Sequence, residues 1–416
     1  MKLRPSRSSS QWLRFFWSSL SAYSVFGIAA AQDAFSNLPA LPSGFYEAAA
    51  TVIGEQKGPR VGDLDLSLSL NTLYDTNVTQ GNELGPRPEE SDFLVQPTLA
   101  GSYEIGPGNW QIGATGSLSR INYLETDGFN ATVYSAGLLG LYQTGKVTAS
   151  LKTGYASNAG VNRLAGDFIE QKTFSNSARI NYRLSSKTSA EVLWTQQSTG
   201  NETEGFADTS SNTFNAAALW QATPLIRLGP GFRYGVRTGQ VGAQLQDAEF
   251  TVAGPLLRAD YNLSAKVNLT SSVGIDFADT PSGEDELLNW RVGLNYRASA
   301  LWGVNLKMVR DTQATLTTGR GFDQISSYSF GYTRKIRRAN LQLGVTYVDR
   351  DPQGSTGAAL GFRDSTSVDY TASLGFPIIG DEVNLKVNLA WRDFTAVDDL
   401  QSWDGFQSGL SLAWRF

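Results

Sequence analysis

The sequence contains no cysteine and no histidine among its 416 residues. Without cysteine there are no disulfides, no thiolate nucleophiles and no cysteinyl metal sites. Without histidine the commonest general base and the commonest transition-metal ligand are missing, which excludes a Ser-His-Asp hydrolase. We therefore expect neither an enzyme nor a resident metal or cofactor, with a carboxylate-only enzyme as the remaining catalytic alternative.

Charge and long apolar runs are also scarce. Charged residues make up 18% of the chain, below the usual quarter, and the formal net charge is -5. Such a chain has no global basic field, so nucleic acid is not an expected partner. Beyond residue 31 no stretch approaches the 18 consecutive apolar residues of a membrane-spanning helix.

The N-terminus has the organisation of a secretory signal peptide. Four basic residues lie within the first 14 positions, and residues 15–31 carry no charge. Small residues end this stretch and predict cleavage near Ala31, so that residues 1–31 are removed. A membrane anchor is the alternative. Residues 32–62 contain three prolines and show no period, and we interpret them as a periplasmic leader.

From residue 63 onward the dominant period is two. Leu64, Leu66 and Leu68 alternate with Asp65 and Ser67, the pattern of a strand with one apolar and one polar face. Eighteen such segments of roughly 10 to 15 residues can be placed, each long enough to cross a bilayer when tilted. They begin near residues 63, 91, 110, 131, 146, 171, 188, 212, 225, 249, 266, 286, 301, 325, 340, 365, 382 and 405.

The connections between these segments alternate between short turns and longer polar loops. In lipid every backbone polar group needs an internal partner, so the sheet must close. We predict an all-β, transmembrane, antiparallel up-and-down barrel over residues 63–416, with about 18 strands (16 to 18), short periplasmic turns and longer extracellular loops. A soluble propeller or sandwich is the alternative. Aromatic residues expected to form interfacial belts are Tyr123, Tyr155, Trp194, Trp220, Trp290, Trp302, Tyr347 and Trp391.

The chain ends on an aromatic residue. Leu410, Leu412, Trp414 and Phe416 share one face of the last predicted strand. This pattern resembles the recognition signal of the outer-membrane barrel-assembly machinery. The resemblance implies that machinery as a partner and the cell outer membrane as the location.

A second resemblance lies at the start of the predicted barrel. The run Tyr74-Asp75-Thr76-Asn77-Val78 is followed by Ser91-Asp92-Phe93-Leu94 and Pro97. Over roughly 30 residues this resembles the second β-barrel porin family. The resemblance implies an outer-membrane barrel, sometimes associated with polysaccharide export, with no established substrate. Ordinary turn chemistry at a strand end is the alternative account of Asp75 and Asn77.

The alternation also assigns charged side chains to the inward face. A barrel this wide is expected to hold a water-filled lumen rather than a side-chain core. One hypothesis is a basic wall that attracts anions. The alternative is that these arginines only hydrate the lumen and pair with carboxylates such as Glu191, Asp260, Asp276 and Asp311. The predicted inward arginines are Arg179, Arg183, Arg227, Arg233, Arg237, Arg258, Arg291, Arg297 and Arg392.

Together these patterns predict a porin-like channel for passive diffusion of small hydrophilic solutes, with anions as one candidate class. The alternative is a barrel component of polysaccharide export or envelope assembly that acts with periplasmic partners; a structural barrel occluded by its own loops is another. Outer-membrane lipid and lipopolysaccharide are expected contacts. The sequence also allows association into a homo-oligomer. The fairly apolar segment 160–165 is a candidate inward constriction.

Overall fold

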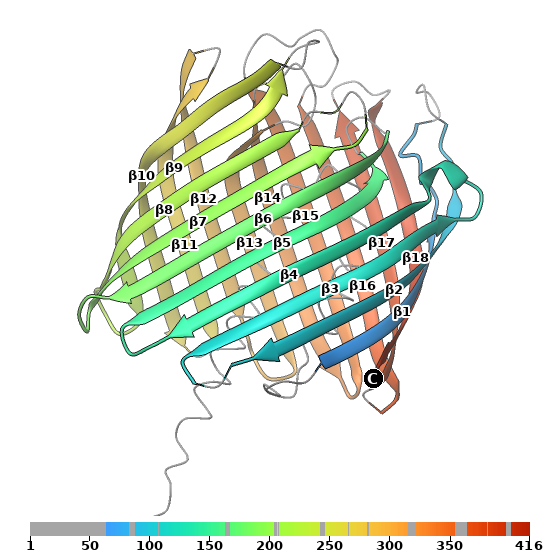
Figure 1. The fold of residues 1–416 in the computed structure, drawn as a ribbon, viewed down its shortest axis with the longest axis horizontal. Coiled ribbons are helices and arrows are strands. Elements are labelled where there is room, and N and C mark those ends of the chain that lie inside the picture. The colour runs from blue at the N-terminus through green and yellow to red at the C-terminus, as the bar shows by residue number, and fades with distance from the viewer. Residues whose placement is uncertain are drawn as a thin grey trace, which may run out of the picture.

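The chain forms one closed sheet of 18 antiparallel strands (Figure 1), as the alternation predicts. The computed structural model describes residues 64–82, 88–106, 108–162, 167–203, 206, 208–241, 246–264, 266–280, 283–314, 322–353, 364–380, 382–396 and 401–416. The predicted signal peptide and leader lie outside these residues. The first strand pairs with both the second and the last, so the sheet has no free edge and the predicted fold class is confirmed.

The strands follow the chain in order around the wall. They are β1 (Leu64–Asp75), β2 (Asp92–Ile105), β3 (Trp110–Tyr123), β4 (Ala131–Gln143), β5 (Val147–Val161), β6 (Phe168–Arg183), β7 (Thr188–Asn201), β8 (Thr209–Gln221), β9 (Ile226–Val241), β10 (Gln246–Ser264), β11 (Val267–Thr280), β12 (Gly283–Tyr296), β13 (Trp302–Ala314), β14 (Phe322–Ile336), β15 (Ala339–Gln353), β16 (Ser365–Ile379), β17 (Val383–Ala396) and β18 (Trp403–Arg415). A 3-10 helix, η1 (Asp127–Phe129), follows β3. In the described part of the chain no helix is long and apolar enough to span a membrane.

The predicted strand starts lie within three residues of the observed ones, but some strands are longer than expected. β10 has 19 residues, and β9 and β10 remain paired up to Val241 and Gln246. The segments 239–248 and 279–285, expected to be long loops, are therefore mostly strand. Extending a hairpin pairs further backbone N–H and C=O groups, which is favourable wherever the chain can stay extended.

Apart from β9–β10 and β11–β12, the connections at one end of the barrel are longer than those at the other. We call the end that carries the β1–β2 connection the loop end and the opposite end, where Phe416 lies, the turn end. Strands β1 to β9 face the viewer in Figure 1, with the turn end at the bottom. The closing seam between β1 and β18 runs from Ser67 opposite Arg415 to Asp75 opposite Gln407.

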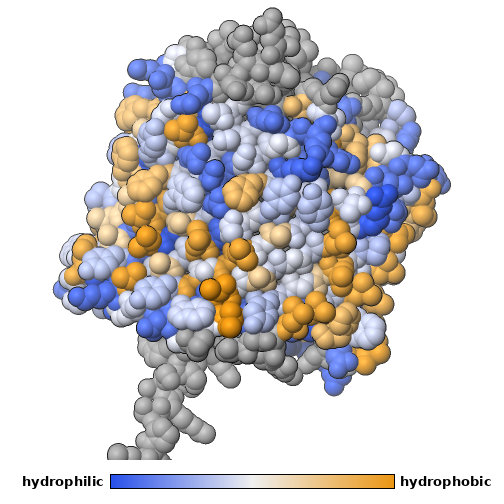
Figure 2. Space-filling model, viewed as in Figure 1, coloured by the Kyte–Doolittle hydropathy of each residue, from blue (hydrophilic) through white to orange (hydrophobic). Residues whose placement is uncertain are grey.

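Figure 2 shows one side of the outward face, on which apolar residues are interspersed with weakly polar ones and strongly hydrophilic residues gather towards the loop end. Aromatic side chains pack against one another on this face. The ring centres of Trp290 and Tyr328 lie 5.9 Å apart midway along β12 and β14, and those of Tyr296 and Trp302 lie 5.5 Å apart at the turn end. Tyr123 was assigned to such a belt, and this was wrong. It pairs with the buried Leu94 and packs inside the barrel.

The inward face is not uniformly polar, contrary to the expectation of a lumen without a side-chain core. Among the described residues, three small apolar clusters face inward in the loop-end half of the barrel. Each combines residues from neighbouring strands, which bury apolar surface against one another instead of exposing it to water. The clusters are Leu73, Leu94 and Ile121; Phe250, Val252, Ala278 and Leu287; and Phe394, Ala396 and Trp403.

Candidate functional site: the ion-paired interior

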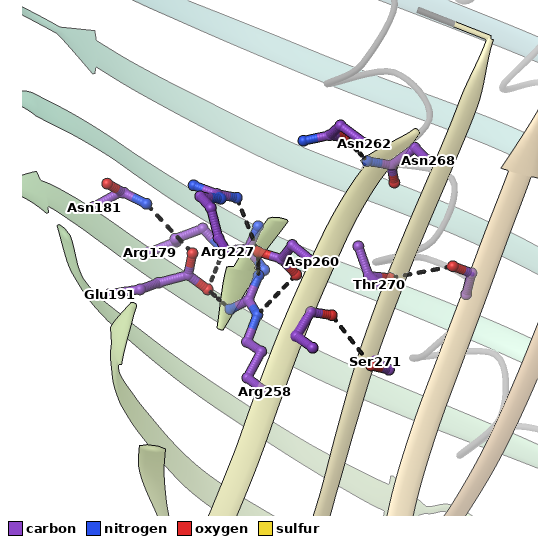
Figure 3. A network of polar contacts seen from close by, with 12 residues as sticks. Arg179, Asn181, Glu191, Arg227, Arg258, Asp260, Asn262, Asn268, Thr270 and Ser271 are labelled. Atoms are coloured by element: carbon purple, nitrogen blue, oxygen red, sulfur yellow. Dashed lines mark hydrogen bonds and ion pairs between the residues drawn. The ribbon is translucent and has the colours of Figure 1, made fainter. Parts of the chain in front are cut away.

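The first group of charges is the turn-side cluster, formed by residues of β6, β7, β9 and β10 (Figure 3). Arg227 donates to Asp260 at 2.8 Å, and the guanidinium of Arg258 binds the same carboxylate at 3.2 Å. Arg258 also pairs with Glu191, and Arg179 lies 4.0 Å from Glu191. Three arginines thus share two carboxylates, which leaves a formal surplus of one positive charge.

The second group is the loop-side cluster, which lies further along the inward faces of β9, β11, β12 and β13. Arg233 donates to Asp276 at 3.0 Å and to Asp311 at 2.6 Å. Arg237 and Arg291 also point to Asp311, at 3.5 Å and 2.5 Å. Again three arginines share two carboxylates. All these side chains except that of Arg291 are at least nine-tenths buried.

The wall itself is folded inward beside the loop-side cluster. Cα atoms of β13 lie within 8 Å of Cα atoms of β8 and of β9, although β10, β11 and β12 separate them in the sheet. The Arg233–Asp311 ion pair therefore joins two parts of the wall across the interior. Alternation predicts that both side chains point inward, but it gives no sign that they meet.

The ninth predicted arginine, Arg392, lies at the closing seam. Its guanidinium donates to both oxygens of Asp75, at 3.0 Å and 2.8 Å, and lies 5.4 Å from the ring centre of Trp403. Gln407 donates to the same carboxylate at 2.5 Å. Residues of β1, β17 and β18 are thus tied together where the first and last strands meet.

Asn77 and Asp92 of the family-like motif anchor connections at the loop end. The Asn77 side chain donates to the carbonyls of Gly81 and Asp404, at 3.0 Å and 2.9 Å. Asp92 accepts backbone N–H groups of residues 124–126, the shortest at 2.8 Å from Thr126. These contacts organise loops, as the turn-chemistry alternative expected. Asp75 also accepts the backbone N–H of Asn77 at 3.0 Å, in addition to its contact with Arg392 at the seam.

The other two motif residues, Tyr74 on β1 and Pro97 on β2, contact neighbouring residues of the wall. Tyr74 packs against Phe93 with ring centres 5.3 Å apart. Pro97 has no N–H to donate to β3, and the β2–β3 ladder skips Pro97. The hydroxyl of Ser119 fills this gap by donating to the Pro97 carbonyl at 3.2 Å.

Arg183 and Arg297 differ from the other predicted arginines. Both side chains are exposed near the turn end, and neither has an ion pair among the residues described. The four residues of the C-terminal pattern point outward and are exposed, with Trp414 and Phe416 in edge contact at 5.4 Å. The backbone N–H of Phe416 donates to Leu66 at 3.1 Å and extends the seam to the last residue.

Sequence reasoning missed two features of the interior. Gln80, after β1, donates to the carbonyl of Val161 at 3.4 Å, so the β1–β2 connection reaches the end of β5. Arg350 pairs with Asp323 at 3.9 Å on β15 and β14. In the candidate constriction 160–165, Val161 and Asn162 are buried, and residues 163–165 lie outside the described part.

No protein-family model and no curated protein matches the chain. Among solved structures, OccAB2 of Acinetobacter baumannii has a TM-score of 0.44 and 11% identity, over 85% of this chain and 98% of that one. OpdL of Pseudomonas aeruginosa has a TM-score of 0.41 and 14% identity, over 85% and 98%. The siderophore receptor PirA of Acinetobacter baumannii has a TM-score of 0.45 and 8% identity, over 86% and 81%. This likeness is too distant to bear on function, and the resemblance to the second β-barrel porin family stays a prediction.

Proposed function

We propose that the chain is an outer-membrane channel through which small hydrophilic solutes diffuse passively. The proposal is carried by the contrast between the two faces of one closed wall. Outward side chains such as Leu68, Leu99 and Trp220 are exposed and apolar, whereas the inward face carries hydroxyls, amides and paired charges. A closed wall with an apolar exterior suits lipid, and a polar interior suits water and hydrophilic solutes.

Anions are the solutes that the charge balance favours. Each ion cluster has three arginines against two carboxylates, and Arg183 and Arg297 add exposed positive charge near the turn end. Basic groups along a pore favour anions. Because seven of the nine arginines have carboxylate partners, we expect a modest preference rather than a strict filter.

The location follows from the two ends of the sequence. Residues 1–31 would direct export and be cleaved near Ala31, and the face with Leu410, Leu412, Trp414 and Phe416 would be recognised by the barrel-assembly machinery. Lipid and lipopolysaccharide would then contact the outward face. An ordered segment 32–62 that binds a periplasmic partner would favour the export or envelope-assembly alternative.

The test is conductance of the refolded mature protein in a planar bilayer, with the reversal potential measured across a salt gradient. We expect a stable conductance with a modest anion preference that weakens from about 0.1 M to 1 M salt, because the screening length falls from about 10 Å to 3 Å. The Arg183→Gln/Arg297→Gln variant should reduce the preference without closing the channel. A folded barrel that never conducts would refute the channel, and a cation preference would refute the assignment of anions.

A further inference from the structure

Asp311 occupies an unusual position in the interior. Its carboxylate accepts from Arg233 and Arg237 of β9 and from Arg291 of β12, and it belongs to β13. Its side chain is only 10% exposed. Three cations from two other strands thus converge on one buried anion, which concentrates the electrostatic attraction at a single residue.

The geometry of the wall makes this convergence unexpected. Neighbouring strands lie about 4.8 Å apart, so strands separated by three others lie about 19 Å apart along the wall. A wide barrel without an inward fold would keep β9 and β13 well apart. Their Cα atoms nevertheless come within 8 Å. The wall is therefore bent inward between them, and something must hold the bend.

The inward face of β9 carries three glycines that lie close to the neighbouring strands. A Cβ at Gly229 or Gly231 would meet backbone atoms of β8, and a Cβ at Gly235 would meet the side chain of Val252 on β10. Arg233 then spans to Asp276 on β11 and Asp311 on β13. The glycines allow close packing of β9 against β8 and β10, and the ion pairs fasten β9 to β11 and β13.

The cluster is incompletely satisfied. Nη1 of Arg237 and Oδ1 of Asp276 are buried without a hydrogen-bond partner among the residues that the structure describes. Buried polar atoms of this kind raise the free energy of the closed arrangement, because water would solvate them if β9 and β13 separated. The fastening therefore depends on the contacts that Asp311 makes.

We propose that Asp311 determines the aperture of the channel by latching β13 to β9 across the interior. This role rests on the channel function proposed above. With the latch closed, the two walls meet and the solute path runs through the rest of the cross-section. Without it, β9 and β13 separate and the path widens.

The turn-side cluster supplies a matched control. Asp260 is also a buried carboxylate that binds two arginines, Arg227 and Arg258. Those arginines lie on β9 and on its own strand β10, which are neighbours in the sheet. Asp311→Asn and Asp260→Asn each remove one negative charge from the interior, but only the first removes a bond across it.

We would compare single-channel conductance in Asp311→Asn, Asp260→Asn and the unmodified protein. We expect both variants to shift towards anions, and only Asp311→Asn to conduct roughly twofold more or better, because conductance follows the width of the pore as well as its charge. Equal conductance in the two variants would overturn the latch. Arg233→Gln, with Arg227→Gln as its control, tests the same bond from the other side: it should raise conductance although it removes a positive charge.

A distance measurement separates failure of the latch from failure of the channel. Because the chain has no cysteine, spin labels can be placed at Tyr234→Cys and Met308→Cys, outward positions on β9 and β13. With Asp311→Asn the distance between the labels should increase and its distribution broaden, whereas Asp260→Asn should leave it unchanged. An unchanged distance with Asp311→Asn would overturn the latch even if the protein conducts, and an increase would support it even in a silent barrel.

Discussion

The ion pair between Asp75 and Arg392 should be the most sensitive point of the closing seam. Asp75 lies on β1 and Arg392 on β17, and β18 lies between them in the sheet. Both side chains are more than nine-tenths buried. The Asp75→Ala substitution would leave the guanidinium of Arg392 buried without its carboxylate, and Gln407 without its acceptor.

The free energy of unfolding should fall substantially, because the charge of Arg392 would be buried without a partner. Removing one partner of a buried ion pair typically destabilises a protein by about 3–5 kcal/mol. The cation–π contact with Trp403, which offsets part of this at roughly 1 kcal/mol, would remain. We therefore expect Asp75→Ala to lose about 3 kcal/mol, since Arg392 can relax towards water at the loop end.

The assay is equilibrium unfolding of the refolded barrel in denaturant, followed by tryptophan fluorescence and by heat-dependent gel mobility. Asp404→Asn is the control, because that side chain is exposed on β18 of the same seam. The double variant Asp75→Leu/Arg392→Leu should recover much of the loss, since apolar pairs often replace buried ion pairs at little cost. A loss for Asp75→Ala no larger than that of Asp404→Asn would refute the reasoning.

Three further perturbations test other parts of the structure. Asp92→Ala should cost about 2 kcal/mol and speed hydrogen exchange at residues 124–126, because their N–H groups lose a charged acceptor; unchanged exchange would contradict the anchoring role. Ile121→Ala should cost about 2–4 kcal/mol in unfolding experiments by opening a cavity inside the barrel, and more than Ile112→Ala on the outward face of the same strand; the reverse order would mean that the inner cluster is not packed. Deleting Phe416 should lower the amount of assembled barrel in cells while refolding in detergent micelles still succeeds, and normal assembly in cells would contradict the C-terminal signal.

Alternation predicted the strands and the face of most charged residues because it depends on backbone geometry alone. Successive side chains of a strand point to opposite faces, so Arg227, Arg233 and Arg237 had to share a face wherever the strand ended. The same rule applied to Tyr123 would have placed it inward with Ile121. Its assignment to a belt used only its nearness to a strand end, and that is why it was wrong.

The partners across the interior could not be predicted in this way. Arg233 and Asp311 are 78 positions apart, and their meeting depends on the inward bend of the wall between β9 and β13. The seam pair of Asp75 and Arg392 is separated by 317 positions and follows only once the sheet is known to close. Local patterns fix the face of a side chain, whereas the shape of the wall fixes what it touches.

The positive charge of the inward arginines is therefore smaller in the structure than the sequence suggests. Counted along the chain they describe a basic wall, but Asp75, Glu191, Asp260, Asp276 and Asp311 neutralise most of it locally. What remains is a small surplus of positive charge in each cluster. An inward face rich in arginine is therefore compatible with a pore that selects only weakly between ions. In such a pore the width of the path matters as much as its charge, and a single carboxylate that holds two walls together can influence both.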